Sequence, residues 1–369
     1  MHIKRIDEMH IYDENGREIV RPRNRSDLKK IIERTVVEQG TECDLNFIDT
    51  SHITDMSMLF FKSDFNGDIS EWDVSNVKTM QSMFDESKFN GDISKWDVSG
   101  VENMESMFIR SEFNGDVSKW NVGRVLDMSF MFTQSEFNGD VSDWNVGNVR
   151  YFTGMFSDMH RENGALACDL SGWDVGNAIS MWGMFMGTTF NGDVSKWNVG
   201  KVKTMESMFK YSTFNGDVSK WDVSNVEEMG GMFAGTPFNG DVSRWNVGKV
   251  RDMNTMFDGS KFDGDVSKWD VGRVENMDSM FHASDFSGDV SDWNVGNVKK
   301  MQYMFEWCSN FDCDLSKWDV SNVKDMERML AHTAFSHDVS DWNVSESSNT
   351  NEIFYSSPLE KNPPAWYKK

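Results

Sequence analysis

The stretch that decides the fold is residues 113–122, Phe-Asn-Gly-Asp-Val-Ser-Lys-Trp-Asn-Val, which recurs with few changes along most of the chain. Its tryptophan occurs in twelve copies spaced by 24 residues, except for one interval of 29 (Trp144 to Trp173) and one of 25 (Trp293 to Trp318). A period of this length predicts an array of structural repeats, in which each repeat buries its apolar side chains against its neighbours.

We number positions within a repeat from the valine of Gly-Asp-Val, so that Val117 is position 1, Trp120 position 4 and Asp140 position 24. The alternation of apolar and polar residues over positions 3–7 (residues 119–123) predicts a short parallel strand. Apolar residues three apart at Val125, Met128 and Met131 predict a helical or 3-10 turn on the opposite side. We therefore expect an α/β solenoid of about thirteen coils, similar to a leucine-rich-repeat array.

The pattern Trp-Asn-Val-x-x-Val-x-x-Met-x-x-Met-Phe, followed by Phe-Asn-Gly-Asp-Val-Ser, resembles the BspA-like leucine-rich repeat surface proteins. The resemblance covers about residues 41–345 and implies a leucine-rich-repeat solenoid. For many members of that family it also implies a bacterial surface protein that adheres to host or neighbouring-cell proteins.

The repeat pattern divides the chain into three parts. Residues 1–40 are expected to form an N-terminal cap, a hairpin followed by a helix that begins at Ser26-Asp27 and ends at Gly40. Residues 41–345 are the repeat array, with an insertion at 157–169, and residues 346–369 are expected to form a C-terminal cap or tail.

The net charge of −23 argues against direct binding of nucleic acid or of anionic membranes. No run of residues is typical of a transmembrane helix, so insertion into a membrane is not expected. Residues 1–8 lack the apolar core of a signal peptide. Cys43, Cys168 and Cys313 are too far apart in the array to pair, so the four cysteines are expected to be free thiols. The chain as given is therefore expected in the cytoplasm, or at the cell surface if a signal has been removed.

Catalytic and metal-binding patterns are weak. No nucleophile–base arrangement or phosphate-binding loop recurs, so we expect neither an enzyme nor a cofactor. The aspartate at position 24 of each repeat is expected to cap a turn rather than to bind calcium. Two adjacent repeats carry zinc-type ligands in an unusual spacing, for which we favour a structural role without metal: Cys308, Cys313, His332 and His337.

Candidate binding residues are large apolar groups at positions that the repeat elsewhere fills with small or polar ones. They either pack against the insertion or form a patch that binds a protein partner, with Phe130, Tyr151 and Trp182 as anchors. Tyr303 and Trp307 form a second, smaller group. With two residues of the insertion, the expected partner-binding set is Ile109, Leu126, Phe130, Tyr151, His160, Arg161, Ile179, Trp182, Met186 and Tyr211.

The sequence therefore favours a non-enzymatic, protein-binding leucine-rich-repeat scaffold. A bacterial surface adhesin is the first alternative, and it follows from the family resemblance. The second is an acidic intracellular inhibitor of a nucleic-acid-binding protein, whose binding would depend strongly on salt. The identity of the partner is not encoded in any of these patterns.

Overall fold

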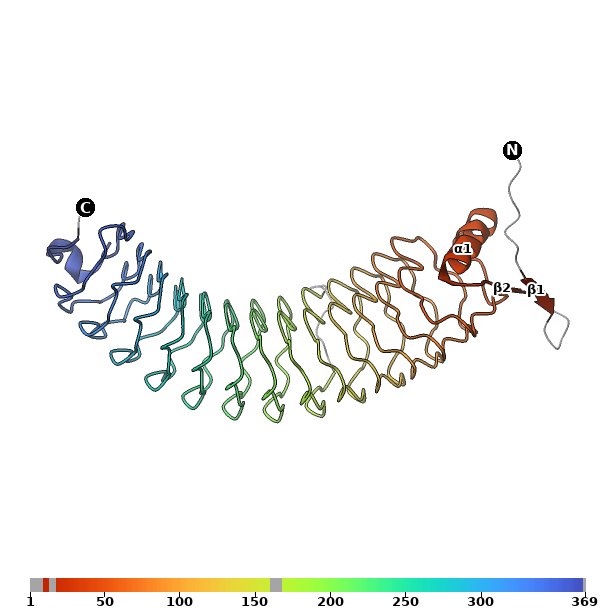
Figure 1. The fold of residues 1–369 in the computed structure, drawn as a ribbon, viewed down its shortest axis with the longest axis horizontal. Coiled ribbons are helices and arrows are strands. Elements are labelled where there is room, and N and C mark those ends of the chain that lie inside the picture. Colours follow the sequence, from red (N-terminus) through yellow and green to blue (C-terminus); the bar gives the residue numbers. More distant parts are fainter. Residues whose placement is uncertain (1–8, 13–17, 160–167, 368–369) are drawn as a thin grey trace. The chain divides into compact units, whose positions relative to one another are not determined.

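The computed structural model describes residues 9–12, 18–159 and 168–367. The chain divides into two compact units, unit 1 (Met1–Asp174) and unit 2 (Val175–Lys369). Within each unit, successive 24-residue repeats lie side by side (Figure 1). Regular secondary structure is confined to four short elements in the described ranges, so the repeats are held together by other contacts.

Unit 1 begins with a two-stranded antiparallel sheet and a helix. Strand β1 (Met9–Tyr12) pairs with β2 (Glu18–Arg21), and α1 (Arg25–Gln39) follows. The side chain of Asn24 accepts a hydrogen bond from the backbone N–H of Asp27 and begins the helix, and Gly40 ends it at a φ of 95°. The turn of the expected hairpin lies outside the described residues.

These elements cover the first repeat (Figure 1). The backbone N–H of Val20 donates to the carbonyl of Phe47 at 3.0 Å, which joins β2 to that repeat. From α1, Arg25 Nε donates to the carbonyl of Ser57 at 2.5 Å and Lys29 Nζ to that of Met58 at 3.4 Å. Backbone carbonyls at an open edge are thereby satisfied by side chains, as an array requires at its end.

Neighbouring repeats are joined through positions 11–18, which we call the ladder segment. Backbone N–H groups at positions 12, 14, 16 and 18 donate to carbonyls at positions 11, 13, 15 and 17 of the next repeat; Phe130, for example, donates to Thr153 at 2.7 Å. Isolated parallel bridges at position 11 follow the same register, from Asp55 to Tyr151 in unit 1 and from Ser180 to Asn349 in unit 2. The ladder is therefore continuous across several repeats within each unit.

Positions 14 and 18 of the ladder segment have a left-handed backbone conformation. Phe130 has a φ of 56° and Gln134 a φ of 53°, and the equivalent residues of the other repeats also have positive φ. Such a conformation costs a non-glycine residue about 1–2 kcal/mol. Glycine occupies only six of these positions, so the hydrogen bonds of the ladder must offset that cost at the others.

The expected parallel strand at residues 119–123 is absent, as is the expected helical turn after it. The backbone there forms successive turns, in which Trp120 N–H donates to the Val117 carbonyl at 3.0 Å. The side chains of Asp116 and Asn121 accept from the N–H groups of Ser118 and Gly123. Because local turns use these donors, they are not available for a strand ladder, and parallel pairing occurs at position 11 instead.

The core consists of columns of identical side chains. Trp120 is 4% exposed, and its indole N–H donates to the carbonyl of Ile93 in the preceding repeat at 3.1 Å. The rings of Phe84 and Phe108 stack with centroids 5.5 Å apart and planes inclined by 2°. Each column is thus formed only when repeats stack, which explains why the sequence pattern persists so strictly.

In unit 2 the ladder continues past residue 345, where we expected the array to end. His332 N–H donates to the carbonyl of Tyr355 at 2.8 Å, in the usual register. Trp366 then occupies position 4 of a further repeat, and its indole donates to Val339 as the earlier tryptophans do. A 3-10 helix, η1 (Pro358–Lys361), carries Glu360, whose carboxylate accepts the ladder N–H of Ser356 at 2.9 Å.

Candidate functional site: the ladder face

Exposed large apolar side chains of the repeats gather at one part of the repeat. All of those in the described ranges lie in the ladder segment or at position 10, directly before it. We call the outward side chains of positions 10–18 the ladder face. Its exposed members are Met58, Leu126, Tyr151, Tyr211, Trp307 and Tyr355.

Unit 1 holds four residues of the expected partner-binding set. Leu126 and Tyr151 are about two-fifths exposed and lie on neighbouring repeats, since the N–H of Arg150 donates to the Leu126 carbonyl at 2.8 Å. Phe130 and Ile109 are half-buried. A Cβ on Gly154 would lie 2.6 Å from Phe130 Cδ1, so this ring packs on the glycine of the next repeat. Phe130 is therefore part of the packing between repeats.

Four further members of the set lie in unit 2. Trp182, Ile179 and Met186 are half-buried, and they are not on a helix, so the expected helical stripe does not form. The Trp182 side chain hydrogen-bonds to Glu206, a contact that lowers the pKa of this carboxyl, although burial raises it more. Tyr211 is 63% exposed and packs one ring face over Gly235.

The insertion residues of the set, His160 and Arg161, lie outside the described residues. Whether the apolar residues pack against the insertion, the alternative weighed from the sequence, therefore stays a prediction. Among the described members of the set, only Leu126, Tyr151 and Tyr211 are exposed.

A surface cluster of three aromatic residues in ring contact lies near the end of unit 2. The indole of Trp307 stacks on the imidazole of His332, with centroids 3.7 Å apart and planes inclined by 6°. His332 meets the ring of Tyr355 edge-on at 5.2 Å. These three residues, which we call the aromatic strip, occupy positions 17 and 18 of three successive repeats, and Trp307 remains 53% exposed.

Charged groups fix the aromatic strip from one side. Arg328 bonds through Nη2 to the buried carboxylate of Glu306 at 2.7 Å and through Nη1 to Glu352 at 3.3 Å. Its guanidinium lies 5.5 Å from the centre of the Tyr355 ring, within the range of a cation–π contact. Two carboxylates and one aromatic ring of the strip thus contact the same arginine.

A histidine–carboxylate pair continues this network. Nδ1 of His282 lies 2.7 Å from the carboxylate of Asp258, and Nε2 lies 3.9 Å from Glu306. The hydrogen bond with Asp258 raises the pKa of His282, against the opposing effect of burial. Protonation of His282 is thereby favoured beside two acidic groups.

Sequence reasoning found only part of the aromatic strip. It singled out Trp307 together with Tyr303, which is half-buried and hydrogen-bonded to Glu327. It assigned His332 to a zinc-type set and Tyr355 to the C-terminal cap. The signal was present, since all three strip residues fall at positions 17 or 18, but the 25-residue interval between repeats conceals the alignment.

The zinc-type residues do not converge. Cys308 is buried and its thiol donates to the Phe281 carbonyl at 2.9 Å, whereas Cys313 lies beside the Asp289 carboxylate at 3.4 Å. Burial raises the pKa of Cys308 to about 12 and that of Cys313 to about 11, so both remain thiols. His337 hydrogen-bonds to the carbonyl of Asp312. Across the described ranges, no group of three His, Cys, Asp or Glu side chains has the arrangement of a metal site.

The aspartate at position 24 acts in a turn. The carboxylate of Asp116 accepts the backbone N–H of Ser118 at 2.9 Å, and the same contact recurs in each repeat from Asp68 to Asp338. This hydrogen bond lowers the pKa of Asp116. The turn interpretation of this column is therefore confirmed for the described residues.

Four overlapping segments of the chain match the family described as "Mycoplasma protein of unknown function, DUF285": residues 27–135, 109–187, 157–266 and 258–366. Together they extend over nearly all of the repeats. No curated protein and no solved structure matches the chain significantly. Of the helices found in the described part of the chain, neither has the length and apolar character of a membrane-spanning segment.

Proposed function

Because the chain belongs to the repeat family described as "Mycoplasma protein of unknown function, DUF285", we propose that it is a non-enzymatic repeat scaffold that binds a protein partner through its ladder face. The repeats supply a rigid support, and the exposed aromatic side chains supply the contacts. Rigid aromatic groups of this kind contribute most of the binding energy at protein interfaces.

The proposed architecture is a leucine-rich-repeat-like solenoid of about thirteen coils. Hydrogen bonds between residues 24 apart and columns of stacked rings support it. Solution scattering from an elongated array should give a radius of gyration well above that of a compact chain of the same length, about 21 Å.

One observation carries the proposed binding function: the exposed large apolar side chains of the repeats gather on the ladder face. Scattered single apolar residues on a surface need no explanation, whereas aromatic residues in direct contact at ordered positions favour an interface. Trp307 contacts His332, and His332 contacts Tyr355, through their rings, and Arg328 lies over the ring of Tyr355. A preorganised group loses little side-chain entropy on binding, which favours affinity.

The absence of catalysis is part of the proposal. His282 and Asp258 have the arrangement of a general base and the carboxylate that orients it. The other ring nitrogen of His282, however, faces Glu306, which is itself paired with Arg328 beside the aromatic strip. Nearly every repeat position has a packing or turn role, which leaves few groups for chemistry.

A bacterial adhesin related to the BspA-like proteins is the second candidate. It is supported by the specific Trp-Asn-Val and Phe-Asn-Gly-Asp-Val-Ser motifs. In that case the protein partner of the ladder face would belong to a host or neighbouring cell. Protease treatment of intact cells distinguishes the candidates, because only a surface-displayed chain would be cleaved.

A quantitative pull-down from the native host tests the proposed function. We expect wild-type protein to retain one or a few proteins that the double variant Trp307→Ser, Tyr355→Ser does not retain. The matched control is Lys268→Ser, Lys317→Ser, which changes two exposed residues at position 3 of the repeat. Equal recovery by all three proteins would show that the strip is not the binding surface.

A further inference from the structure

A basic band runs along unit 2 at positions 8 and 10 of six successive repeats, starting with the repeat of Val194. It carries seven cations and two acids, Glu227 and Glu275, so its net charge is +5. The whole chain, with 37 basic and 60 acidic residues, has a charge of −23. The cations are Lys201, Lys203, Lys249, Arg251, Arg273, Lys299 and Lys324.

Both acidic residues of the basic band are already paired with lysines. Lys203 bonds to Glu227 at 3.2 Å and Lys299 to Glu275 at 2.5 Å. Two other lysines, Lys201 and Lys249, each donate to an asparagine side chain of the preceding repeat at 2.6 Å. The cations that remain are dominated by two arginines.

Among the described residues, neither Arg251 nor Arg273 forms a close ion pair or a side-chain hydrogen bond, although the charge of Arg251 contributes, after Lys299, to lowering the pKa of Glu275. Arginine also presents a planar fork of donors that matches the oxygens of phosphate and carboxylate groups. Arg251 and Arg273, on adjacent repeats, therefore offer two such sets of donors to an anion.

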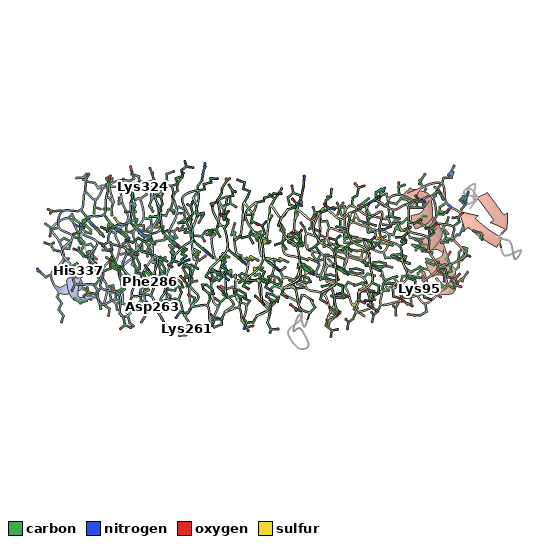
Figure 2. The ribbon with its side chains drawn as sticks, turned by 90° about the horizontal axis from the view of Figure 1, so that it is seen from below. Lys95, Lys261, Asp263, Phe286, Lys324 and His337 are labelled. Atoms are coloured by element: carbon green, nitrogen blue, oxygen red, sulfur yellow. The ribbon has the colours of Figure 1, made fainter. Side chains whose placement is uncertain are left out.

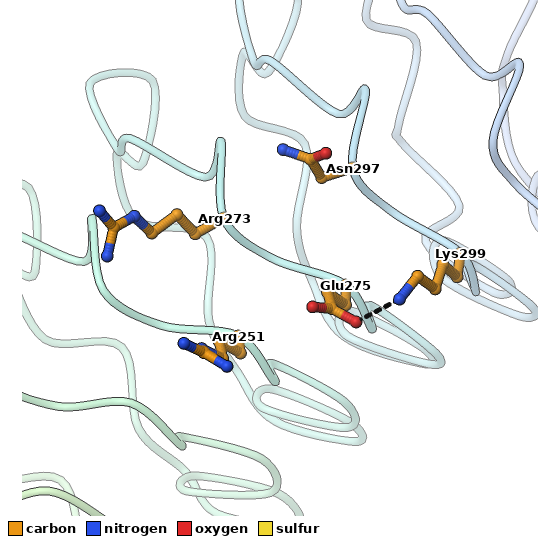
Figure 3. Close-up of a pocket in the computed structure, with 5 residues that line it drawn as sticks. All are labelled: Arg251, Arg273, Glu275, Asn297 and Lys299. Atoms are coloured by element: carbon orange, nitrogen blue, oxygen red, sulfur yellow. Dashed lines mark hydrogen bonds and ion pairs between the residues drawn. The ribbon is translucent and has the colours of Figure 1, made fainter.

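These arginines line a pocket of about 330 Å³ together with Glu275, Asn297 and Lys299 (Figure 3). Figure 3 shows the amino group of Lys299 turned toward Glu275, whereas neither arginine side chain has a contact of this kind drawn. Three cations and one acid give the lining a net charge of +2. The amide of Asn297 adds a neutral donor from a third repeat.

We propose that this pocket binds a phosphomonoester group. Such a group carries a charge of roughly −1.5 to −2 at neutral pH and three acceptor oxygens, which match both the +2 charge and the donors of the lining. A single carboxylate would neutralise only half of this charge. Nucleic acid is disfavoured, because it carries one charge per phosphate and its backbone would be repelled by the strongly acidic chain.

The pocket is separate from the aromatic strip, and this inference does not rest on the proposed function. The aromatic strip occupies positions 17 and 18, whereas the pocket residues occupy positions 8 and 10. In Figure 2, Lys324, at position 10, lies along the edge of unit 2 opposite to that of Lys261 and Asp263, at positions 20 and 22.

The test measures binding of two probes to the full chain at constant ionic strength: inorganic phosphate, and a peptide with one phosphoserine among neutral residues. We expect the wild type to bind at least one probe, and Arg251→Gln, Arg273→Gln to lose roughly tenfold affinity for each arginine. The control Lys220→Gln, Arg244→Gln removes the same charge at position 3 and should bind like the wild type. Near-ultraviolet circular dichroism verifies that each variant is folded.

The probes also identify the source of the phosphate. Binding of the phosphopeptide indicates a phosphate carried by a macromolecule, and binding of inorganic phosphate alone indicates a small phosphate ligand. The proposal is overturned if neither probe binds, or if the pocket and control variants lose affinity equally. It is also overturned if a peptide with glutamate in place of phosphoserine binds as tightly, because the site would then be a general acceptor of acidic groups.

Discussion

The indole of Trp307 and the imidazole of His332 lie face to face, 3.7 Å apart between ring centroids, on adjacent repeats of unit 2. Both residues have the left-handed backbone conformation, with φ values of 66° and 56°. That conformation turns the two side chains outward in register, so a costly backbone geometry produces a flat aromatic surface. The same conformation recurs at position 18 of the other repeats, so it is a property of the ladder that these two aromatic residues share.

The first prediction separates surface tryptophans from core tryptophans. Trp293→Ala should lower the free energy of unfolding by about 3–5 kcal/mol, because it empties a column position that is 4% exposed. Trp307→Ala should cost about 1 kcal/mol or less, since its side chain is half exposed. Urea denaturation followed by circular dichroism measures both.

The same comparison can be made at Trp182 and Trp197. Trp182 is half-buried and hydrogen-bonded to Glu206. The loss in free energy of unfolding caused by Trp182→Ala should therefore lie between those caused by Trp307→Ala and Trp293→Ala. A loss as large as that of Trp197→Ala would show that Trp182 belongs to the core, and that its assignment as a binding anchor is wrong.

The second prediction concerns the contact between Tyr211 and Gly235. A Cβ on Gly235 would lie 2.4 Å from Tyr211 Cδ1, and Gly235 has a φ of 65°. Gly235→Ala should therefore destabilise the protein through both backbone strain, about 1–2 kcal/mol, and the clash with the ring. Removing the ring with Tyr211→Ala should recover the part that is due to the clash.

Gly259 provides the matched control. Its φ is 62°, but a Cβ there would come no closer than 4.0 Å to its nearest neighbour. Gly259→Ala should show the backbone cost alone, without coupling to Tyr211→Ala. Equal losses for both glycines, measured by urea denaturation, would mean that the Tyr211 ring does not pack on Gly235.

The third prediction is a pH dependence from His282. The hydrogen bond with Asp258 raises the pKa of His282 above its ordinary value of 6.5. A raised pKa in the folded state means that the stabilisation is fully present below pH 6.5 and is lost as the pH rises through the folded-state pKa. His282→Gln should therefore flatten the fall in urea midpoint above pH 6.5. An unchanged slope would contradict the Asp258 contact.

The fourth prediction concerns acid. The pKa of Asp116 is lowered by the hydrogen bond from Ser118, so its stabilisation is present above the ordinary value of 3.8 and is lost as the pH falls through the folded-state pKa. Asp116→Asn keeps the acceptor and should weaken this acid dependence, whereas Asp116→Ala should destabilise at neutral pH as well. Thermal melts between pH 3 and 7 measure this difference between the two variants. Identical dependence of the melting temperature on pH for both variants would contradict the turn-capping role.

The repeat and its core were predictable because each buried position must be filled identically in every copy. The columns of Trp120 and Val122 could therefore be read directly from the sequence. The ladder could not, because its hydrogen bonds come from backbone groups and its left-handed residues, such as Phe130 and Gln134, are mostly not glycine. Period-2 alternation at 119–123 indicated a strand, but Asp116 and Asn121 use the nearby N–H groups in turns.

The candidate surfaces were only partly predictable for a related reason. A contact between repeats joins residues 24 or 25 apart, so a useful pattern appears only when the repeats are aligned in columns. His332 looks like a metal ligand beside Cys308, but its column neighbours are Trp307 and Tyr355. The sequence alone does not show that Arg251 and Arg273 line one pocket, or that Glu275 in that pocket is paired with Lys299.

Site-specific photo-crosslinking tests the central claim, that the ladder face of unit 2 binds a protein. A photoreactive phenylalanine analogue replaces Tyr355, which is 43% exposed in the aromatic strip, or Lys317 at position 3 as the control. After irradiation in the native host, we expect position 355 to form a covalent adduct with a protein that the pull-down also retains, and position 317 to form none with it. Equal adducts from both positions, or none from position 355, would contradict the account.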